Sequence, residues 1–445
     1  MPTLNSIARV VDLLDPNKNV LYDVSVDDAR AVVAGGDADA IGRIGGQFAL
    51  VGRDGTTVRM ARTIGRIMRY FIAKRAAGPA LIVSDRIDAI QRWLDAAGLG
   101  DQFHPSYTRM VPAHHLVEIR LVGCPDPNPA YARFFRPPPP HSGELPADLD
   151  VIGKRYVQAV QAEMVRWLGS IPPTAPIGVA FSGGIDSGSV FLLAYDAVRR
   201  LGMNPSRLKA FTLSVDGGGE DAAQARASLD GLDLGLFLEV VEVPPDAIDT
   251  HAAIRVMEDY KPLDVQAGAM VLALCRAIRD RYPDWKHLLD GDGGDENLKD
   301  YPIEENPELT IRSVLNNPML YQEGWGVESI KHSLTYSGGQ SRGYVRTYAP
   351  ASATGFDAFS PYTSPSVIAV AEAIPFAVLT GWNHDRLYEL KGEIVSRGVR
   401  AVTGMEMPVY AKRRFQHGVM SASRAGDPFP ARADDYRRMF NEIYA

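Results

Sequence analysis

Residues 182–187, with the sequence Ser-Gly-Gly-Ile-Asp-Ser, bring together two hydroxyls, a glycine pair and one carboxylate. The apolar run 176–181 before them predicts a buried strand, and the periodic run 190–201 after them predicts a helix that ends at Gly202. A tight glycine turn between strand and helix leaves backbone N–H groups free, and the helix N-terminus adds about half a positive charge. This stretch therefore predicts a cradle for the phosphates of a nucleotide, with Asp186 placed to hold Mg²⁺.

A Gly-Gly pair alone is often only a turn, but the full stretch between a strand and a helix is more specific. No lysine follows the glycines, so it is not the G-x-x-x-x-G-K-[ST] phosphate loop, and the G-x-G-x-x-G spacing is also absent. It resembles instead the loop of enzymes that cleave ATP into AMP and pyrophosphate.

A second polar cluster, residues 290–296, ends the short strand predicted at 287–290 and contains three aspartates, three glycines and one glutamate. It is either a flexible acidic turn or helix N-cap, with Asp295 as the cap, or part of a site. Ligands of parallel sheets bind at the carboxyl ends of strands, so we expect this turn beside the glycine loop. Mg²⁺ bridging Asp186 and Asp295 to the nucleotide would offset the repulsion between carboxylates and phosphates.

Three adjacent cations, Lys412, Arg413 and Arg414, form a third cluster near the C-terminus. Charge alone favours a solvated face. Alternatively, one of these cations reaches the phosphates and stabilises the charge that develops as pyrophosphate leaves.

Four consecutive prolines, 137–140, separate two regions, because such a run forms a stiff connector and cannot lie inside a helix or a central strand. The first region has strand patterns at 47–52, 58–61 and 80–84 and a helix pattern at 87–97, which predict a small α+β domain. The second alternates strands and helices, which predicts an α/β fold with a parallel sheet covered on both faces. Its expected strands are 176–181, 207–215, 236–243 and 287–290, and its expected helices are 148–168, 190–201, 221–229, 246–259 and 265–281.

The composition of the 445-residue chain is that of an ordinary soluble protein of about two domains, with 46% hydrophobic and 23% charged residues. A net charge of −7 argues against an unspecific grip on nucleic acid. The only two cysteines, Cys124 and Cys275, give neither a disulfide framework nor a zinc spacing. We find no signal peptide pattern and no apolar run of membrane-spanning length, and we expect a cytoplasmic protein.

The three clusters, in this order, resemble those of the asparagine synthetase family, which includes β-lactam and carbapenam synthetases and the macrolactam synthetases of lasso peptides. The acidic turn is similar to the family's S-G-E-G-x-D-E turn, and residues 410–419 are similar to its K-x-x-F-x-x-G-V stretch. The resemblance implies a truncated, inactive glutamine-amidotransferase-like α+β domain at 1–135, a Pro-rich linker at 136–147 and an ATP-binding synthetase domain at 148–445. The first domain would be a shortened N-terminal-nucleophile fold, whose opening strands we do not recognise, and the second an adenine nucleotide α-hydrolase-like fold.

The resemblance also implies roles for individual residues around ATP and Mg²⁺. Asp186 and Asp295 would bind the metal, and Lys412 would stabilise the transition states. The nucleotide contacts would come from Ala180 and Leu213 beside the adenine, from Ser182, Gly183, Gly184, Asp186 and Ser187 around the pyrophosphate portion, and from Asp290 and Gly291 of the acidic turn.

Two departures from the family pattern bear on the reaction. Glutamine-dependent members need a cysteine at residue 2, but this sequence has Pro2 and no cysteine before Cys124, so we expect no glutaminase. The position of Asp292 is Glu in asparagine synthetases and Tyr in β-lactam synthetases. We expect Asp292 to pair with Asp357 and take a proton from the attacking amine, although Asp357 could instead only cap a turn.

Extra residues between Tyr301 and Ala353 either form a surface insertion or contribute to the site. In the second case, Arg342 or Arg346 would recognise a substrate carboxylate or cover the acyl-adenylate.

The sequence thus predicts an AMP-forming amide synthetase that couples a small-molecule or peptide carboxylate to an amine without glutamine. Alternatives are an ammonia-dependent asparagine synthetase, a nucleotide-binding scaffold without activity and, ranked low, adenylation for sulfur insertion. We expect no nucleic-acid or membrane partner; a homodimer or a biosynthetic partner protein is compatible with the sequence.

Overall fold

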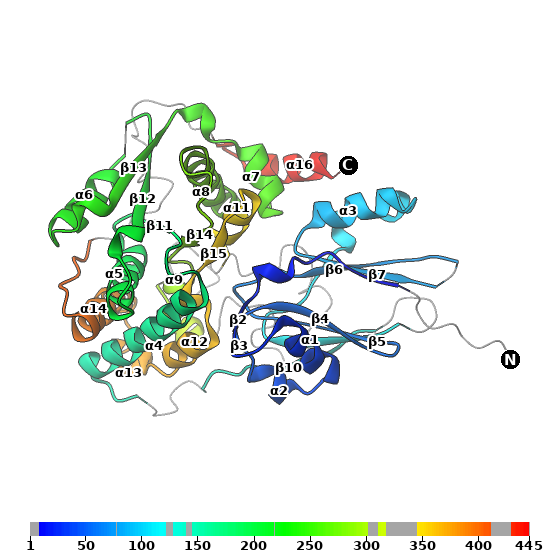
Figure 1. The fold of residues 1–445 in the computed structure, drawn as a ribbon, viewed down its shortest axis with the longest axis horizontal. Helices are drawn as coiled ribbons and strands as arrows, with labels where there is room; N and C mark the ends of the chain where they lie inside the picture. The colour runs from blue at the N-terminus through cyan, green and yellow to red at the C-terminus, as the bar shows by residue number, and fades with distance from the viewer. Residues whose placement is uncertain are drawn as a thin grey trace. The chain divides into compact units, whose positions relative to one another are not determined.

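The computed structural model describes residues 9–76, 78–121, 128–138, 145–217, 219–300, 310–316, 345–410 and 429–444. Contacts divide the chain into two units (Figure 1). Among the described residues, the first unit holds those up to 136 together with 441–444, and the second holds those from 137 to 440. Across these same ranges, no helix is both long enough and apolar enough to cross a bilayer.

The first unit is built from two four-stranded sheets and a short strand pair. The strand orders are β1-β7-β6-β8 and β10-β9-β5-β4, and β2 pairs with β3. The strands are β1 (Arg9–Asp12), β2 (Val20–Tyr22), β3 (Gly45–Gln47), β4 (Ala49–Asp54), β5 (Thr57–Arg62), β6 (Arg69–Ala73), β7 (Ala80–Ser84), β8 (Arg109–Met110), β9 (His115–Arg120) and β10 (Ala130–Arg133).

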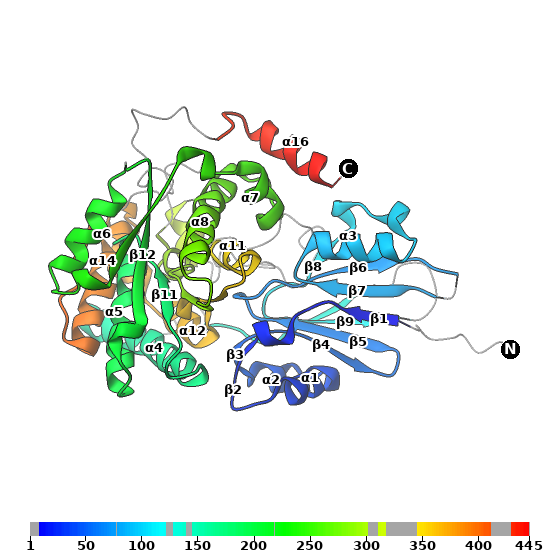
Figure 2. The ribbon, with the colours of Figure 1, turned by 45° about the horizontal axis from the view of Figure 1, so that its top comes forward.

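Helices cover the outer faces of the two sheets. Figure 2 shows α1 (Val26–Gly35) and α2 (Ala38–Gly42) beside β4 and β5, and α3 (Ile87–Ala96) beside β6 and β7. The core between the sheets holds buried apolar side chains from both, among them Val58, Met60, Tyr70, Leu81 and Val83. The strands β1 and β2 were not predicted, because runs of three or four residues are too short to show a period in the sequence.

The second unit has a five-stranded sheet of order β13-β12-β11-β14-β15, and every neighbouring pair is parallel. This confirms the predicted α/β class and parallel sheet. The strands are β11 (Ile177–Ala180), β12 (Leu208–Val215), β13 (Leu238–Val243), β14 (His287–Leu289) and β15 (Asp357–Phe359).

Two groups of helices enclose this sheet. One group contains α4 (Leu149–Ser170), α5 (Ile185–Arg200), α6 (Asp221–Asp230) and α14 (His384–Thr403), and the other contains α7 (Thr250–Met257), α8 (Pro262–Arg281) and α11 (Tyr348–Ala353), as Figure 2 shows. The remaining helices are α9 (Gly294–Asn297), α10 (Ile311–Asn316), α12 (Pro365–Glu372), α13 (Phe376–Thr380) and α16 (Ala433–Ile443).

The helix after the glycine loop begins at Ile185, five residues before the apolar period becomes visible in the sequence. Its first turn carries Asp186 and Ser187, which are polar and therefore hide the period. The start of this helix is thus set by the turn at Gly184, its N-cap, rather than by burial of an apolar face.

Candidate active site

The glycine loop closes on itself through its two hydroxyls. The Ser182 N–H donates to Ser187 Oγ at 3.1 Å, and the Gly184 N–H donates to Ser182 Oγ at 3.3 Å. Gly183 has φ +74°, and a Cβ there would lie 3.0 Å from the backbone of Ala225, so only glycine fits without strain. The two hydroxyls therefore lie together at the N-terminus of α5, a position that favours phosphate binding.

The acidic turn begins with one more hydrogen bond of the sheet, and its chain direction then changes before α9. The Asp290 N–H donates to Phe359 O at 3.2 Å, and the carboxylate of Asp290 accepts from the Asp292 N–H at 3.0 Å. Gly293 has φ +91° and begins α9. The turn is therefore held by its own first aspartate, which lies almost fully buried.

Two glycines of this turn pack directly against the first turn of α5. A Cβ on Gly291 would lie 2.9 Å from Asp186 Cβ, and a Cβ on Gly294 would lie 2.3 Å from Asp186 Oδ1. Because β11 and β14 are adjacent parallel strands, the segments that follow them meet at one edge of the sheet. The predicted juxtaposition of the glycine loop and the acidic turn is thus present in the structure.

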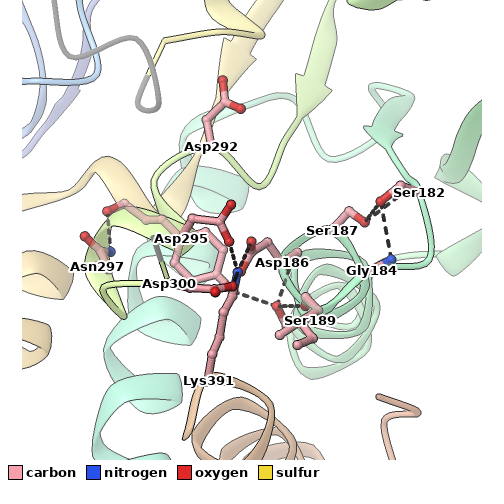
Figure 3. A network of polar contacts seen from close by, with 12 residues as sticks. Ser182, Gly184, Asp186, Ser187, Ser189, Asp292, Asp295, Asn297, Asp300 and Lys391 are labelled. Atoms are coloured by element: carbon pink, nitrogen blue, oxygen red, sulfur yellow. Dashed lines mark hydrogen bonds and ion pairs between the residues drawn. The ribbon is translucent and has the colours of Figure 1, made fainter. Parts of the chain in front are cut away.

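A lysine that the sequence analysis missed lies between the two predicted metal ligands. Lys391 of α14 places Nζ 2.5 Å from Asp186 Oδ2 and pairs with Asp295 Oδ1, and Asp300 Oδ2 lies 3.5 Å away (Figure 3). Burial alone would lower the pKa of this ammonium, but the carboxylates of Asp186, Asp295 and Asp300 raise it well above its ordinary value. Asp186 and Asp295 are therefore brought together around one permanently charged cation.

The sequence carried a weak signal for Lys391. It lies in α14 on the buried face formed by Leu387, Leu390 and Ile394, where a lysine is unexpected unless it has a partner. Asp300 was missed because nothing in the sequence shows that this residue, three positions after α9, lies beside Lys391.

Asp292 belongs to a different charge cluster, and Figure 3 shows it apart from Lys391. Its Oδ2 accepts from the Thr347 N–H at 2.6 Å. Desolvation and the neighbouring Asp290 raise the pKa of Asp292 well above its ordinary value, although Thr347 and Arg346 act in the opposite direction. A carboxyl with a raised pKa is suited to proton transfer.

The Arg346 guanidinium is surrounded by carboxylates. Its Nε lies 3.1 Å from Asp264 Oδ1, and Asp264, Glu296 and Asp292 together raise the pKa of its guanidinium against the effect of burial. The idea that Arg346 recognises a substrate carboxylate does not fit these surroundings, because such a substrate would meet the carboxylates that already hold the guanidinium.

The structure does not bring Asp357 to Asp292, which corrects the predicted pair. Asp357 is the first residue of β15 and pairs in register with His287, the first residue of β14. Asp292 follows the opposite end of β14, and its carbonyl accepts from Ser360 Oγ at 2.7 Å. Ser360 lies three residues beyond Asp357, roughly 10 Å along an extended strand.

The other predicted site residues are placed as follows. Ala180 ends β11, and Leu213 is buried near the carboxyl end of the neighbouring strand β12. Lys412 and Arg342 lie outside the described residues, so their roles stay predictions. Cys275 is buried in α8, and burial raises the pKa of its thiol to about 12, which does not suit a nucleophile for sulfur insertion.

The donor set at this edge suits Mg²⁺ held jointly with phosphates. Within the part of the chain that the structure covers, no group of three or more His, Cys, Asp or Glu side chains could hold a metal ion by itself. Mg²⁺ in nucleotide sites is usually bound by one or two carboxylates together with phosphate oxygens. The partly exposed Asp186 and Asp295 would supply such a pair beside the glycine loop.

Comparison with known proteins agrees with this geometry. Residues 173–354 match the family model described as asparagine synthase, so this domain belongs to that family of ATP-dependent, amide-forming ligases, and the resemblance seen in the motifs is confirmed. Amidase chyE of Penicillium rubens is 28% identical over 159 residues, which cover 34% of this chain and 22% of the relative. The chain therefore matches less than a quarter of that relative's length.

Proposed function

We propose that this protein is an ATP-dependent synthetase that adenylates a substrate carboxylate, releases pyrophosphate and couples the activated acyl group to an amine, without glutamine as nitrogen source. The observation that supports the proposal is the packing of Gly291 and Gly294 on Asp186, because it brings the acidic turn beside the glycine loop. The asparagine synthase domain at 173–354 supports the reaction class.

The described residues divide the work between the two halves of the reaction. The hydroxyls of Ser182 and Ser187 and the N-terminus of α5 would bind the phosphates and align the α-phosphorus with the attacking carboxylate. Bound Mg²⁺ would supply charge neutralisation for the leaving pyrophosphate, with Asp186 and Asp295 as its protein ligands. Lys412, by its predicted role, would also stabilise the charge of the leaving pyrophosphate.

Asp292 would serve the second half of the reaction. An amine that arrives as an ammonium ion must lose a proton before it attacks the acyl-adenylate. With its raised pKa and fixed by Thr347, Asp292 would accept that proton, and Arg346 would limit how far the pKa rises. Asp357 has no part in this scheme, because it lies at the other end of the strand.

The proposal is tested with purified protein, Mg·ATP and a panel of amino acids, diacids and short peptides, with hydroxylamine as the nucleophile. An acid that is a substrate releases pyrophosphate and yields a hydroxamate, because hydroxylamine traps the acyl-adenylate. The Lys412→Ala variant should release none. ATP binding without pyrophosphate release from any acid would instead identify a nucleotide-binding scaffold.

An ammonia-dependent asparagine synthetase is the second candidate, and the match of 173–354 to the asparagine synthase model favours it. The two candidates differ in their substrates. Aspartate with ammonium chloride would give asparagine, AMP and pyrophosphate in this case, whereas the first proposal requires another acid or another amine. The coupling of two groups within one molecule, as in a lactam, would appear as a cyclic product without added amine.

A further inference from the structure

The two oxygens of Asp186 have different surroundings. Oδ1 is buried and faces Gly294. A Cβ added to Gly294 would lie only 2.3 Å from Oδ1, so little space separates the two. Oδ2 is the oxygen that pairs with Lys391 at 2.5 Å. A metal ion that binds Asp186 from the solvent side must therefore take or share the oxygen that the lysine holds.

Lys391 cannot readily leave this position. Its side chain is 3% exposed and arises from the middle of α14, which packs against α4 and α5. The ammonium faces Asp186, Asp295 and Asp300, so the cluster carries a net charge of −2 when all four groups are ionised. The net charge of −2 would thus be balanced by a divalent cation, but the Lys391 ammonium already lies against the oxygens of Asp186 and Asp295 that the metal would need.

We propose that Lys391 is the resident cation between Asp186 and Asp295 and excludes free Mg²⁺, so that the metal enters only together with a nucleotide. The inference rests on the proposed function, because it needs a nucleotide that binds at the glycine loop. Phosphates arriving there offer the ammonium a new anionic partner and complete the coordination of the metal. Free Mg²⁺, which gives up its water ligands reluctantly, has neither advantage.

Lys391 acts here as a positioning residue with two effects. It holds the two aspartates at one point without metal, and it couples metal affinity to nucleotide binding. A lysine with a purely structural role would stabilise the fold but would leave the affinity for a free cation unchanged. The two roles are therefore separated by measuring metal binding in the absence of nucleotide.

The experiment uses Mn²⁺ as the probe and counts bound ions by electron paramagnetic resonance, with and without ATP. We expect the wild-type protein to bind Mn²⁺ tightly only with ATP. Lys391→Gln should bind one Mn²⁺ without nucleotide, at least tenfold more tightly than the wild type. Because three carboxylates without their lysine could prevent folding, the double variant Asp300→Asn/Lys391→Gln lowers the repulsion and keeps both predicted ligands.

The matched control is Lys209→Gln, which removes a lysine of the same unit that pairs with Glu239 at 2.7 Å. It should bind Mn²⁺ as the wild type does. Equal binding of nucleotide-free Mn²⁺ by the wild type and both Lys391 variants would overturn the inference. Variants that bind Mn·ATP but not Mn²⁺ alone would also overturn it. Neither result would contradict the proposed function. If no form binds Mn·ATP, the proposed function fails, and the inference with it.

Discussion

The two units contain different kinds of ionisable cluster: two buried histidines in the first, and three aspartates around a buried lysine in the second. In the first unit, His114 and His115 stand at the start of β9 next to Arg62. Burial is the main reason that the pKa of His115 falls to about 4, and nearby arginines lower it further; burial and Arg62 also keep the pKa of His114 well below its ordinary value. Both imidazoles are therefore neutral at pH 7.

Three acids beside the glycine loop in the second unit are treated differently. Asp186, Asp295 and Asp300 surround one ammonium that stays charged, so this cluster retains an excess of negative charge. Arg62, in contrast, donates to the backbone carbonyls of Val111 and Arg66 and so becomes part of the core. A buried charge that hydrogen-bonds to the surrounding core serves the fold, whereas an excess of negative charge beside the glycine loop is available to bind a cation.

We expect the largest effect, a loss of stability, from replacing a buried lysine that forms an ion pair with a single buried carboxylate. Lys299 pairs with Glu372 at 2.9 Å, and both side chains are almost fully buried. Lys299→Met would remove the cation that faces this buried carboxylate and lower the free energy of unfolding by about 3–5 kcal/mol. Urea unfolding measures this loss. The double variant Lys299→Met/Glu372→Gln should recover most of it, and a single variant as stable as the wild type would contradict the contrast.

Asp186→Asn removes one of the three acids around Lys391 and should affect the reaction rather than the fold. We expect the rate of pyrophosphate formation to fall roughly 100-fold, because one metal ligand is lost beside the developing charge. The melting temperature should change little, since Asp295 and Asp300 still face Lys391. The control is Asp196→Asn on the same helix, where the carboxylate pairs with Arg200. Equal losses in both variants would argue against a special role for Asp186.

The pH dependence of stability should reveal the neutral histidines of the first unit. The pKa of His115 is about 4 in the folded protein and about 6.5 when unfolded, so the unfolded chain binds the extra proton between these values. Stability is then highest above pH 6.5 and falls as the pH drops toward 4, by about 2 kcal/mol at pH 5 from His115 alone. Unfolding of His115→Gln at pH 7.5 and 5 should show a flatter profile than the wild type; an unchanged profile would speak against a buried neutral His115.

Gly294→Ala should have the smallest effect, confined to the surroundings of Asp186. The added methyl would come within 2.3 Å of Asp186 Oδ1 and push the aspartate out of place. We expect the affinity for Mg·ATP to fall about tenfold, since displaced ligands are oriented less well. Calorimetric titration with a non-hydrolysable ATP analogue measures it. Gly169→Ala in α4, where a Cβ meets nothing within 4 Å, is the control and should bind normally.

Sequence patterns predicted the parallel sheet, the glycine loop and the acidic turn, because strand–loop–helix order and parallel pairing fix which loops share an edge. They could not predict Lys391, because α14 reaches the acidic turn only through packing on α4 and α5, about 100 residues after that turn in the chain. The pairing of Asp292 with Asp357 was wrong for a related reason. A motif gives the order of residues but not the strand register, and the register puts Asp357 at the start of β15.

Thr347 holds Asp292 with its main-chain amide and also interacts with this carboxyl through its side chain. Every amino acid except proline provides the amide, so most replacements of Thr347 would remove only the side-chain part of the contact. Thr347→Pro is the single replacement there that removes the main-chain donor.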